Sequence, residues 1–158
     1  MRGTIHVTVE RAGMDRLGDA REVFLDSPLY ERYFSAEGKL ESLLTTAIER
    51  RELWLAVDSR GQAVGAMWVE PAGFFGAFPY LALLGVRKDF RGMGVGHTLL
   101  SVYEGVARAL GYRKISLLVS HFNPRAKALY QSLGFRKVGY VPDAILPGID
   151  ENIMVKSL

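Results

Sequence analysis

The sequence predicts an α/β fold in which helices pack on a mixed, mostly antiparallel sheet of about seven strands. Some segments alternate apolar and polar residues as strands do, and others repeat apolar residues at helical spacing. A third kind of segment, "YLALLGV" at residues 80–86, is apolar throughout and indicates a buried central strand. The 158 residues suffice for one domain with a core, and no linker or repeat divides them, so we expect a single domain over 1–158.

The first half of the chain predicts one strand, two helices and a pair of strands. "TIHVTVE" alternates as a strand over 4–10, and helices fit residues 14–25 and 36–51. The second helix has an apolar face made of Leu40, Leu43, Leu44, Ala47 and Ile48. "LWLAV" and "AVGAMWVE" flank "DSRG", which indicates two antiparallel strands joined by a turn. The loop "PAGFFGAF" then leads into the central strand.

The second half predicts two helices and three strands. Apolar residues recur at helical spacing from Gly94 to Leu110, and Gly111 suits the end of that helix. The strand "KISLLVS" follows, and Asn123–Pro124 indicates a helix cap with proline at the first helical position. This short helix ends at Gly134, and strands are expected at 135–141 and 152–156.

Composition and charge narrow the class of protein. The chain has no cysteine, which excludes disulfides and cysteine-based sites. The longest uncharged run, residues 71–86, is shorter than the ~20 apolar residues that a membrane-spanning helix needs, and the N-terminus lacks the apolar stretch of a signal peptide. We therefore expect a soluble, cytoplasmic protein that does not bind membranes.

Positive charge is concentrated around residues 87–140. Residues 1–86 carry nine Lys/Arg and twelve Asp/Glu (−3), residues 87–140 carry ten and two (+8), and the tail carries one and three (−2). The basic segment favours a small polyanionic ligand. Nucleic acid is the rival interpretation, but the basic residues are scattered and form no recognisable nucleic-acid module, so we expect no nucleic-acid partner.

The stretch "RGMGVGHTLL", residues 91–100, places three glycines between the central strand and a helix. The first N–H groups of a helix lack internal partners and lie at its positive end, so a glycine-rich strand–loop–helix turn is suited to bind an anion. The alternative is a turn whose glycines serve only close packing. The loop is no P-loop, because no lysine follows His97, and it does not fit G-x-G-x-x-G from either Gly92 or Gly94.

The loop does match Arg/Gln-x-x-Gly-x-Gly/Ala, as Arg91-x-x-Gly94-x-Gly96. With it, the chain resembles the GNAT superfamily of acetyl-coenzyme A-dependent N-acetyltransferases. "LLGVRKDFRGMGVGHTLL" resembles the family's strand–loop–helix, and "LLVSHFNPRAKALYQSLGF" resembles its following strand and helix. The order of the earlier elements agrees, so the resemblance covers nearly the whole chain and implies a GNAT-like fold.

The resemblance implies acetyl-CoA as cosubstrate and a direct transfer of its acetyl group to a primary amine. The implied cofactor-binding residues are Leu84, Gly85, Val86, Arg91, Gly92, Met93, Gly94, Val95, Gly96, His97, Thr98, Asn123 and Tyr130. Within this set the loop amides bind the diphosphate, the backbone of Leu84 and Val86 binds the pantetheine arm, and Asn123 contacts that arm or only caps its helix. Tyr130 is implied as the general acid toward the departing thiolate, although it also lies on the apolar face of its helix.

The general base is where the sequence departs from the family. Many relatives carry an acidic residue on the central strand, and "YLALLGV" has none. His121 is the replacement we select, because imidazole titrates near physiological pH. Glu70, Tyr80 and a water chain remain alternatives. His6, His97 and His121 show no metal-ligand spacing, so no metal is expected.

The acceptor amine is not specified by the sequence. It is a small molecule or a peptide, bound by the N-terminal helices, by residues 73–78, where "FFGAFPY" could form an aromatic wall, and by the segment "VPDAILPGIDEN". Asp143, Asp150 and Glu151 would suit a cationic amine, but acids in a terminal loop are usually only solvated. The alternative function is a module of the same fold that senses acyl-CoA without turnover. Pairing of two chains into a homodimer is left open, since dimers are common among relatives.

Overall fold

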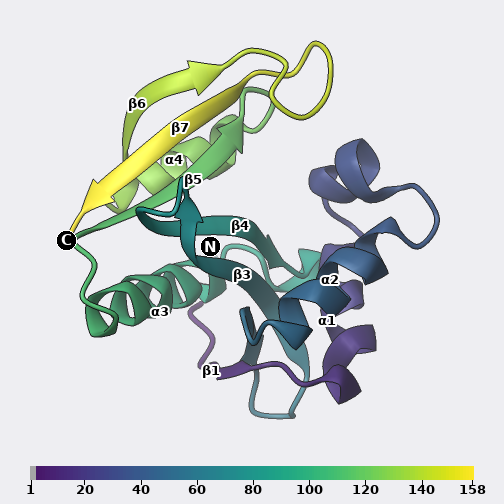
Figure 1. Cartoon of the computed structure of the whole chain (residues 1–158). Helices are drawn as coiled ribbons and strands as arrows, with labels where there is room; N and C mark the ends of the chain where they lie inside the picture. The colour runs from purple at the N-terminus through teal and green to yellow at the C-terminus, as the bar shows by residue number, and fades with distance from the viewer. Residues whose placement is uncertain (1–2) are drawn as a thin grey trace. The chain divides into compact units, whose positions relative to one another are not determined.

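A computed structural model describes residues 3–158 of the chain and confirms the predicted α/β fold (Figure 1). The seven strands form one sheet in the order β1-β2-β3-β4-β5-β7-β6. The strands are β1 (Thr8–Arg11), β2 (Leu53–Val57), β3 (Ala63–Phe74), β4 (Phe78–Val86), β5 (Lys114–Ser120), β6 (Arg136–Val141) and β7 (Glu151–Ser157). The α-helices are α1 (Leu17–Phe24), α2 (Lys39–Glu49), α3 (Val95–Ala109) and α4 (Pro124–Ser132). Shorter helical segments are η1 (Met14–Arg16), η2 (Tyr30–Phe34) and η3 (Lys88–Phe90).

The pairing of the strands makes the sheet mixed and mostly antiparallel, as predicted. β4 and β5 pair in parallel, whereas β1–β2, β2–β3, β5–β7 and β6–β7 pair antiparallel. β4 is the fourth of seven strands, so it is central in the sheet. Its burial alternates, however: Leu81 and Leu83 are buried and their neighbours are partly exposed. The prediction of a strand buried on both faces was therefore wrong for this segment.

Several boundaries differ from the prediction, and two of the differences matter most for the architecture. β1 begins at Thr8 and not at Thr4. Most of the expected loop over 71–78 belongs to β3 and β4, because Phe74 and Phe78 stack with ring centroids 4.6 Å apart and extend the hairpin. Phe75 and Gly76 take φ of 53° and 74°, which lets the chain reverse within a few residues. The aromatic rings thus lie at a hairpin tip rather than in an open loop.

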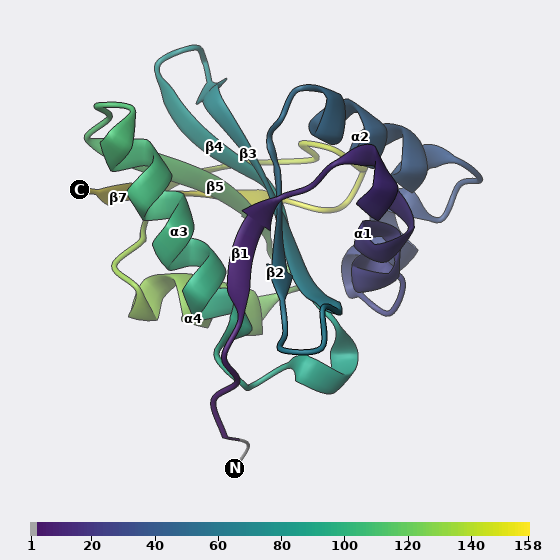
Figure 2. The ribbon, with the colours of Figure 1, turned by 90° about the horizontal axis from the view of Figure 1, so that it is seen from below.

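The chain divides into two compact units, and β3, β4 and α3 each contribute residues to both. The first unit comprises the described part of Met1–Val69 together with Leu83–Tyr103. In it, α1 and α2 lie side by side (Figure 2). The apolar face predicted for the second helix is confirmed at four positions, since Leu40, Leu44, Ala47 and Ile48 are buried in α2.

The second unit comprises Glu70–Ala82 and Glu104–Leu158. Its strands β5, β7 and β6 lie side by side, and α4 crosses one face of them (Figure 1). The side chains of Ile115, Leu117 and Met154 are buried there. Among residues 3–158, no helix is long and apolar enough to cross a membrane.

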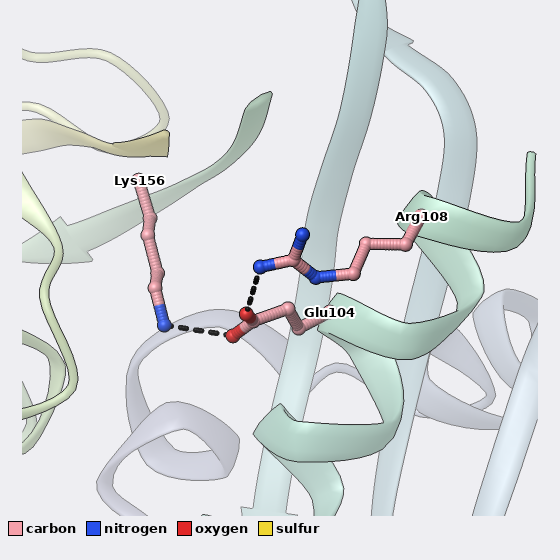
Figure 3. Close-up of polar contacts among 3 residues, drawn as sticks. All are labelled: Glu104, Arg108 and Lys156. Carbon is pink, nitrogen blue, oxygen red and sulfur yellow. Dashed lines mark hydrogen bonds and ion pairs between the residues drawn. The ribbon is translucent and has the colours of Figure 1, made fainter. Parts of the chain in front are cut away.

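Glu104 of α3 links two basic side chains within the second unit (Figure 3). Its carboxylate accepts hydrogen bonds from Lys156 Nζ at 2.7 Å and from Arg108 Nη2 at 2.9 Å. These two bonds hold the pKa of Glu104 below its ordinary value of 4.5, with Lys156 the larger cause. Because the pKa is lowered on folding, the ion pairs contribute their full stability above that ordinary value and lose it as the pH falls through the lowered pKa.

We therefore expect Glu104→Gln to lower the free energy of unfolding by about 1 kcal/mol at pH 7, at the upper end for partly exposed pairs. The difference from wild type should disappear at about pH 2, where the carboxyl is protonated in both states. Urea unfolding at the two pH values measures it. The exposed Glu49 of α2 supplies the control, since Glu49→Gln should change stability by only a few tenths of a kcal/mol. An equal loss at both pH values would contradict the electrostatic account.

Candidate functional site

The glycine loop of the first unit connects the end of β4, through η3, to the first turn of α3. Gly92 has φ of 76° and Gly94 has φ of 87°, a backbone conformation that residues with a Cβ rarely adopt. A Cβ at Gly92 would meet no heavy atom within 4 Å, so backbone conformation and not packing requires this glycine. The alternative of glycines that serve only tight packing does not account for position 92.

Backbone N–H groups along this loop are available for a ligand. Among the described residues, those of Gly92, Met93, Gly94 and Val95 donate no backbone hydrogen bond, and the first bond in this region runs from Thr98 N to Gly94 O at 3.1 Å. Ile5 N donates to Met93 O at 3.0 Å and fixes the loop from the N-terminal side. The start of a 15-residue helix therefore presents donors at its positive end.

Arg91 fixes the loop to its surroundings through two backbone carbonyls. Its Nε donates to Val86 O at 3.2 Å and its Nη2 donates to Asp26 O at 3.1 Å. The guanidinium thus ties the loop to the end of β4 and to the segment that follows α1. These bonds give Arg91 a positioning role that the sequence did not predict.

The implied pantetheine strand, β4, is paired with β5 at Tyr80 and Leu81. Leu84 and Val86 lie further along β4, where both side chains are partly exposed. The carbonyl of Val86 already accepts a hydrogen bond from Arg91 Nε.

Asn123 caps α4, as one of the two interpretations of the sequence predicted. Its Oδ1 accepts the backbone N–H of Ala126 at 3.2 Å, and Pro124 follows at the first helical position. The cap uses the oxygen of the side-chain amide. The amide nitrogen is the group with which Asn123 could donate a hydrogen bond to a ligand.

Tyr130 lies on α4 and is 7% exposed as a residue, and its ring packs edge-on against Phe135 with the ring centroids 5.9 Å apart. Among residues 3–158, the hydroxyl of Tyr130 has no hydrogen-bond partner. Burial raises the pKa of Tyr130 above its ordinary value of 10, and the nearby Tyr80 raises it further. The phenol is therefore neutral and retains its proton at physiological pH, which is the state that a general acid requires.

His121 follows β5 and is exposed. Its Nδ1 accepts the backbone N–H of Asp150 at 2.9 Å, and the backbone N–H of His121 donates to Asp150 O at 3.0 Å. In a neutral imidazole one nitrogen carries the proton and the other carries the lone pair. This geometry assigns the proton to Nε2 and engages the lone pair, so His121 can accept a proton only when the bond to Asp150 opens.

A carboxylate that the sequence placed in a solvated loop is buried instead. Glu151 is the first residue of β7 and is 4% exposed. Ser120 Oγ, in a residue 5% exposed, donates to its Oε2 at 2.7 Å. The only signal in the sequence was the β-strand pattern that begins one residue later, and that pattern does not show which strand lies opposite.

The remaining histidines and the two tryptophans show no arrangement for metal binding or ligand stacking among residues 3–158. His6 and His97 are exposed, and among residues 3–158 no group of three or more His, Asp or Glu side chains is arranged to hold a metal ion. Trp54 and Trp68 are strand residues, and Trp68 Nε1 donates to Glu52 Oε1 at 3.1 Å. Both tryptophans pack on the sheet, as expected.

Comparison with known proteins finds a match over a part of the chain that includes the glycine loop and Tyr130. Residues 17–135 match the acetyltransferase (GNAT) family. A mycothiol acetyltransferase of Propionibacterium freudenreichii subsp. shermanii is 37% identical over 95 residues, which cover 57% of this chain and 30% of that protein. An acetyltransferase of Pectobacterium atrosepticum is 33% identical over 87 residues, which cover 55% of this chain and 60% of that protein. The chain thus spans between 30% and 60% of the length of these two relatives.

The fold is also found in solved structures. The crystal structure of an acetyltransferase of the GNAT family from Bacillus cereus superposes with a TM-score of 0.77. The match covers 96% of this chain and 97% of that chain at 18% sequence identity. At this identity the likeness concerns the fold alone.

Proposed function

Because the chain belongs to the acetyltransferase (GNAT) family, we propose that it transfers the acetyl group of acetyl-CoA to a primary amine within a ternary complex. The observation that carries the proposal is the loop of residues 91–98, with two glycines at positive φ and with N–H groups at Gly92 to Val95 that bind no carbonyl of residues 3–158. Such a turn at a helix start is suited to a diphosphate. The proposed cofactor contacts are those that the sequence implied, at Leu84–Val86, Arg91–Thr98, Asn123 and Tyr130.

In the first unit, the amides of residues 92–97 hold the diphosphate, whereas the N–H of Thr98 already donates to Gly94 O. The backbone of β4 at Leu84 and Val86 binds the pantetheine arm. Arg91 supports the loop through the carbonyls of Val86 and Asp26. Acetyl-CoA supplies the thioester, whose carbonyl carbon the amine attacks. In the second unit, Tyr130 gives its proton to the thiolate that departs when the C–S bond breaks.

Two measurements on the purified chain test this function. Isothermal titration calorimetry with acetyl-CoA measures binding, and a thiol-release assay over a panel of primary amines, amino-acid amides and peptides measures transfer. We expect saturable binding and acceptor-dependent release of CoA with at least one amine class. Absence of binding would contradict the proposal. Binding without acceptor-dependent release would favour the acyl-CoA sensing module instead.

His121 stays a candidate for the base that takes the amine proton, with the restriction that its Nδ1 must first release Asp150. The pH profile of a His121→Ala variant tests it: a limb near neutrality that persists in the variant would remove His121 from the mechanism. The acceptor is proposed to be a small-molecule or peptide amine, and pairing into a homodimer remains a proposal for gel filtration to test.

A further inference from the structure

A buried acid in the second unit lies outside the roles assigned so far. Glu151 is 4% exposed, and burying an ionised carboxylate is costly unless hydrogen bonds compensate it. Ser120 supplies one such bond at 2.7 Å, and the antiparallel register places Ser120 directly opposite Glu151. Paired residues project on the same face of a sheet. β5 and β7 therefore hold this carboxylate on a fixed, rigid part of the fold.

The same face carries a tyrosine between two acids. Tyr80 of β4 pairs with Ser116, which alternation places on the same face of β5 as Ser120. Glu70 of β3 and Tyr80 both adjoin Gly73, since a Cβ at Gly73 would lie 2.7 Å from Glu70 Cβ and 2.9 Å from Tyr80 Cβ, so the two residues are neighbours. Burial, and then the charges of Glu70 and Glu151, raise the pKa of Tyr80 to about 12. Both carboxylates thus lie within electrostatic reach of a neutral phenol, which cannot itself act as a base near pH 7.

A second, independent observation indicates that a ligand belongs here. Tyr130 is more than nine-tenths buried, and its hydroxyl forms no recorded hydrogen bond with residues 3–158. Among residues 3–158, the one enclosed side-chain N or O atom without a partner is Arg16 Nε, so the Tyr130 oxygen stays within reach of solvent and of a partner that arrives with the substrate. Tyr80 lies close enough to Tyr130 to raise its pKa as well. Tyr130 and the carboxylates of Glu70 and Glu151 accordingly lie within electrostatic reach of the same tyrosine, Tyr80, all within the second unit.

We propose that Glu151, held by Ser120, is the catalytic base that accepts the proton of the acceptor's ammonium group, and that Glu70 is the second carboxylate that draws this cation in. This inference rests on the proposed function. It places the missing acid of the central strand two strands away, on β7. The acceptor is accordingly a cationic primary amine that enters as R–NH₃⁺.

The proposed reaction balances in protons and electrons. R–NH₃⁺ gives one proton to the Glu151 carboxylate and becomes R–NH₂, whose lone pair forms the C–N bond at the thioester carbonyl. The C–S bond breaks as the tetrahedral intermediate collapses, and the thiolate takes the Tyr130 proton. The nitrogen then loses its extra proton to the tyrosinate, and Glu151 releases its proton to solvent. The products are the amide, CoA–SH and one proton.

The titratable groups around Glu151 come from several elements. The phenol of Tyr80 on β4 lies within electrostatic reach of Glu151 and also of Glu70 on β3. Asp150 precedes Glu151 in the chain and bonds to His121. Of these groups, His121 is the other candidate base, so the experiment must separate it from Glu151.

The test compares wild type with Glu151→Gln, which keeps the size of the side chain and its ability to bond to Ser120. The assay uses the most active amine from the thiol-release panel, at pH 6 to 11. At neutral pH we expect kcat to fall about 100-fold or more. Because a primary amine loses its proton unaided near pH 10–11, the ratio of wild-type to variant rates should narrow steeply toward pH 11. A merely structural role would lower the rate by the same factor at every pH.

Three further measurements complete the design. Glu151→Gln should keep the acetyl-CoA Kd within about twofold and the melting temperature near that of wild type, because the base does not hold the cofactor. Ser120→Ala should show a smaller loss of kcat with the same pH signature. Glu104→Gln, which removes a carboxylate paired with Lys156 and Arg108, should leave kcat unchanged.

Failure of this inference is distinguishable from failure of the proposed function. If wild type neither binds acetyl-CoA nor releases CoA, the proposed function fails. If wild type is active and Glu151→Gln keeps its rate, or loses it equally at every pH, the base assignment alone is overturned. It is also overturned if His121→Ala removes the pH dependence and Glu151→Gln does not.

Discussion

Tyr130→Phe is expected to lower kcat by about 100-fold or more while acetyl-CoA binds as before. The thiolate of CoA leaves more easily when it takes a proton as the C–S bond breaks, and phenylalanine has none to give. The hydroxyl forms no recorded hydrogen bond with the described residues, so its removal should leave the fold nearly as stable. Steady-state rates in the thiol-release assay, together with calorimetric Kd values, separate the two effects.

The pH dependence of wild type supplies a second check on Tyr130. Burial and Tyr80 raise the pKa of this phenol above 10, so its acid form persists throughout the physiological range. Deprotonation of Tyr130 should therefore cause no decline in the kcat of wild type between pH 7 and 10. Tyr112→Phe, in the turn after α3, serves as the matched control and should change neither constant. Turnover by Tyr130→Phe within twofold of wild type would remove this residue from the mechanism.

Gly94→Val is expected to weaken acetyl-CoA binding by tenfold or more. With φ of 87°, this position imposes a left-handed conformation that costs an L-residue roughly 1–2 kcal/mol, and more when the side chain is β-branched. An added Cβ would also lie 3.3 Å from Thr4 Cγ2. The loop should relieve the strain by turning its N–H groups away from the ligand, and about 1.4 kcal/mol corresponds to a tenfold change in Kd.

The control for this substitution lies on the same helix. Gly105 is exposed in α3, and a Cβ there would meet no heavy atom within 4 Å. Gly105→Ala should leave acetyl-CoA affinity unchanged and raise stability by about 1 kcal/mol, through helix propensity. Equal affinity of Gly94→Val and wild type would contradict the role of the loop, provided that thermal unfolding shows both variants folded.

Patterns local in the chain predicted most of the fold. β2 and β5 begin and end where "LWLAV" and "KISLLVS" do, because apolar β-branched runs bounded by turns specify a strand without help from distant residues. The cap of α4 by Asn123 was likewise readable, since cap, proline and helix are adjacent. The hairpin of residues 71–78 was misjudged because glycine and proline signal loops locally, whereas the stacking of Phe74 on Phe78 depends on the two strands being paired.

The residues of the candidate site likewise divide into those that a local motif predicts and those that it does not. Its glycine loop is a contiguous motif, so the sequence suffices to locate it. The buried carboxylate belongs to no contiguous motif, because Glu151 and Ser120 are 31 residues apart and meet only through the register of β5 and β7. A slip of one residue would turn Glu151 to the other face of the sheet. No spacing rule within the sequence distinguishes such an acid from a solvated one.

The most direct test of the account observes the loop amides themselves. In ¹H–¹⁵N correlation spectra, CoA should shift the amide signals of residues 92–98, whereas pantetheine, which has no diphosphate, should leave them nearly unchanged. If CoA binds while these amides keep their positions, or if pantetheine moves them equally, the diphosphate does not rest on this loop and the assignment of the cofactor site is wrong.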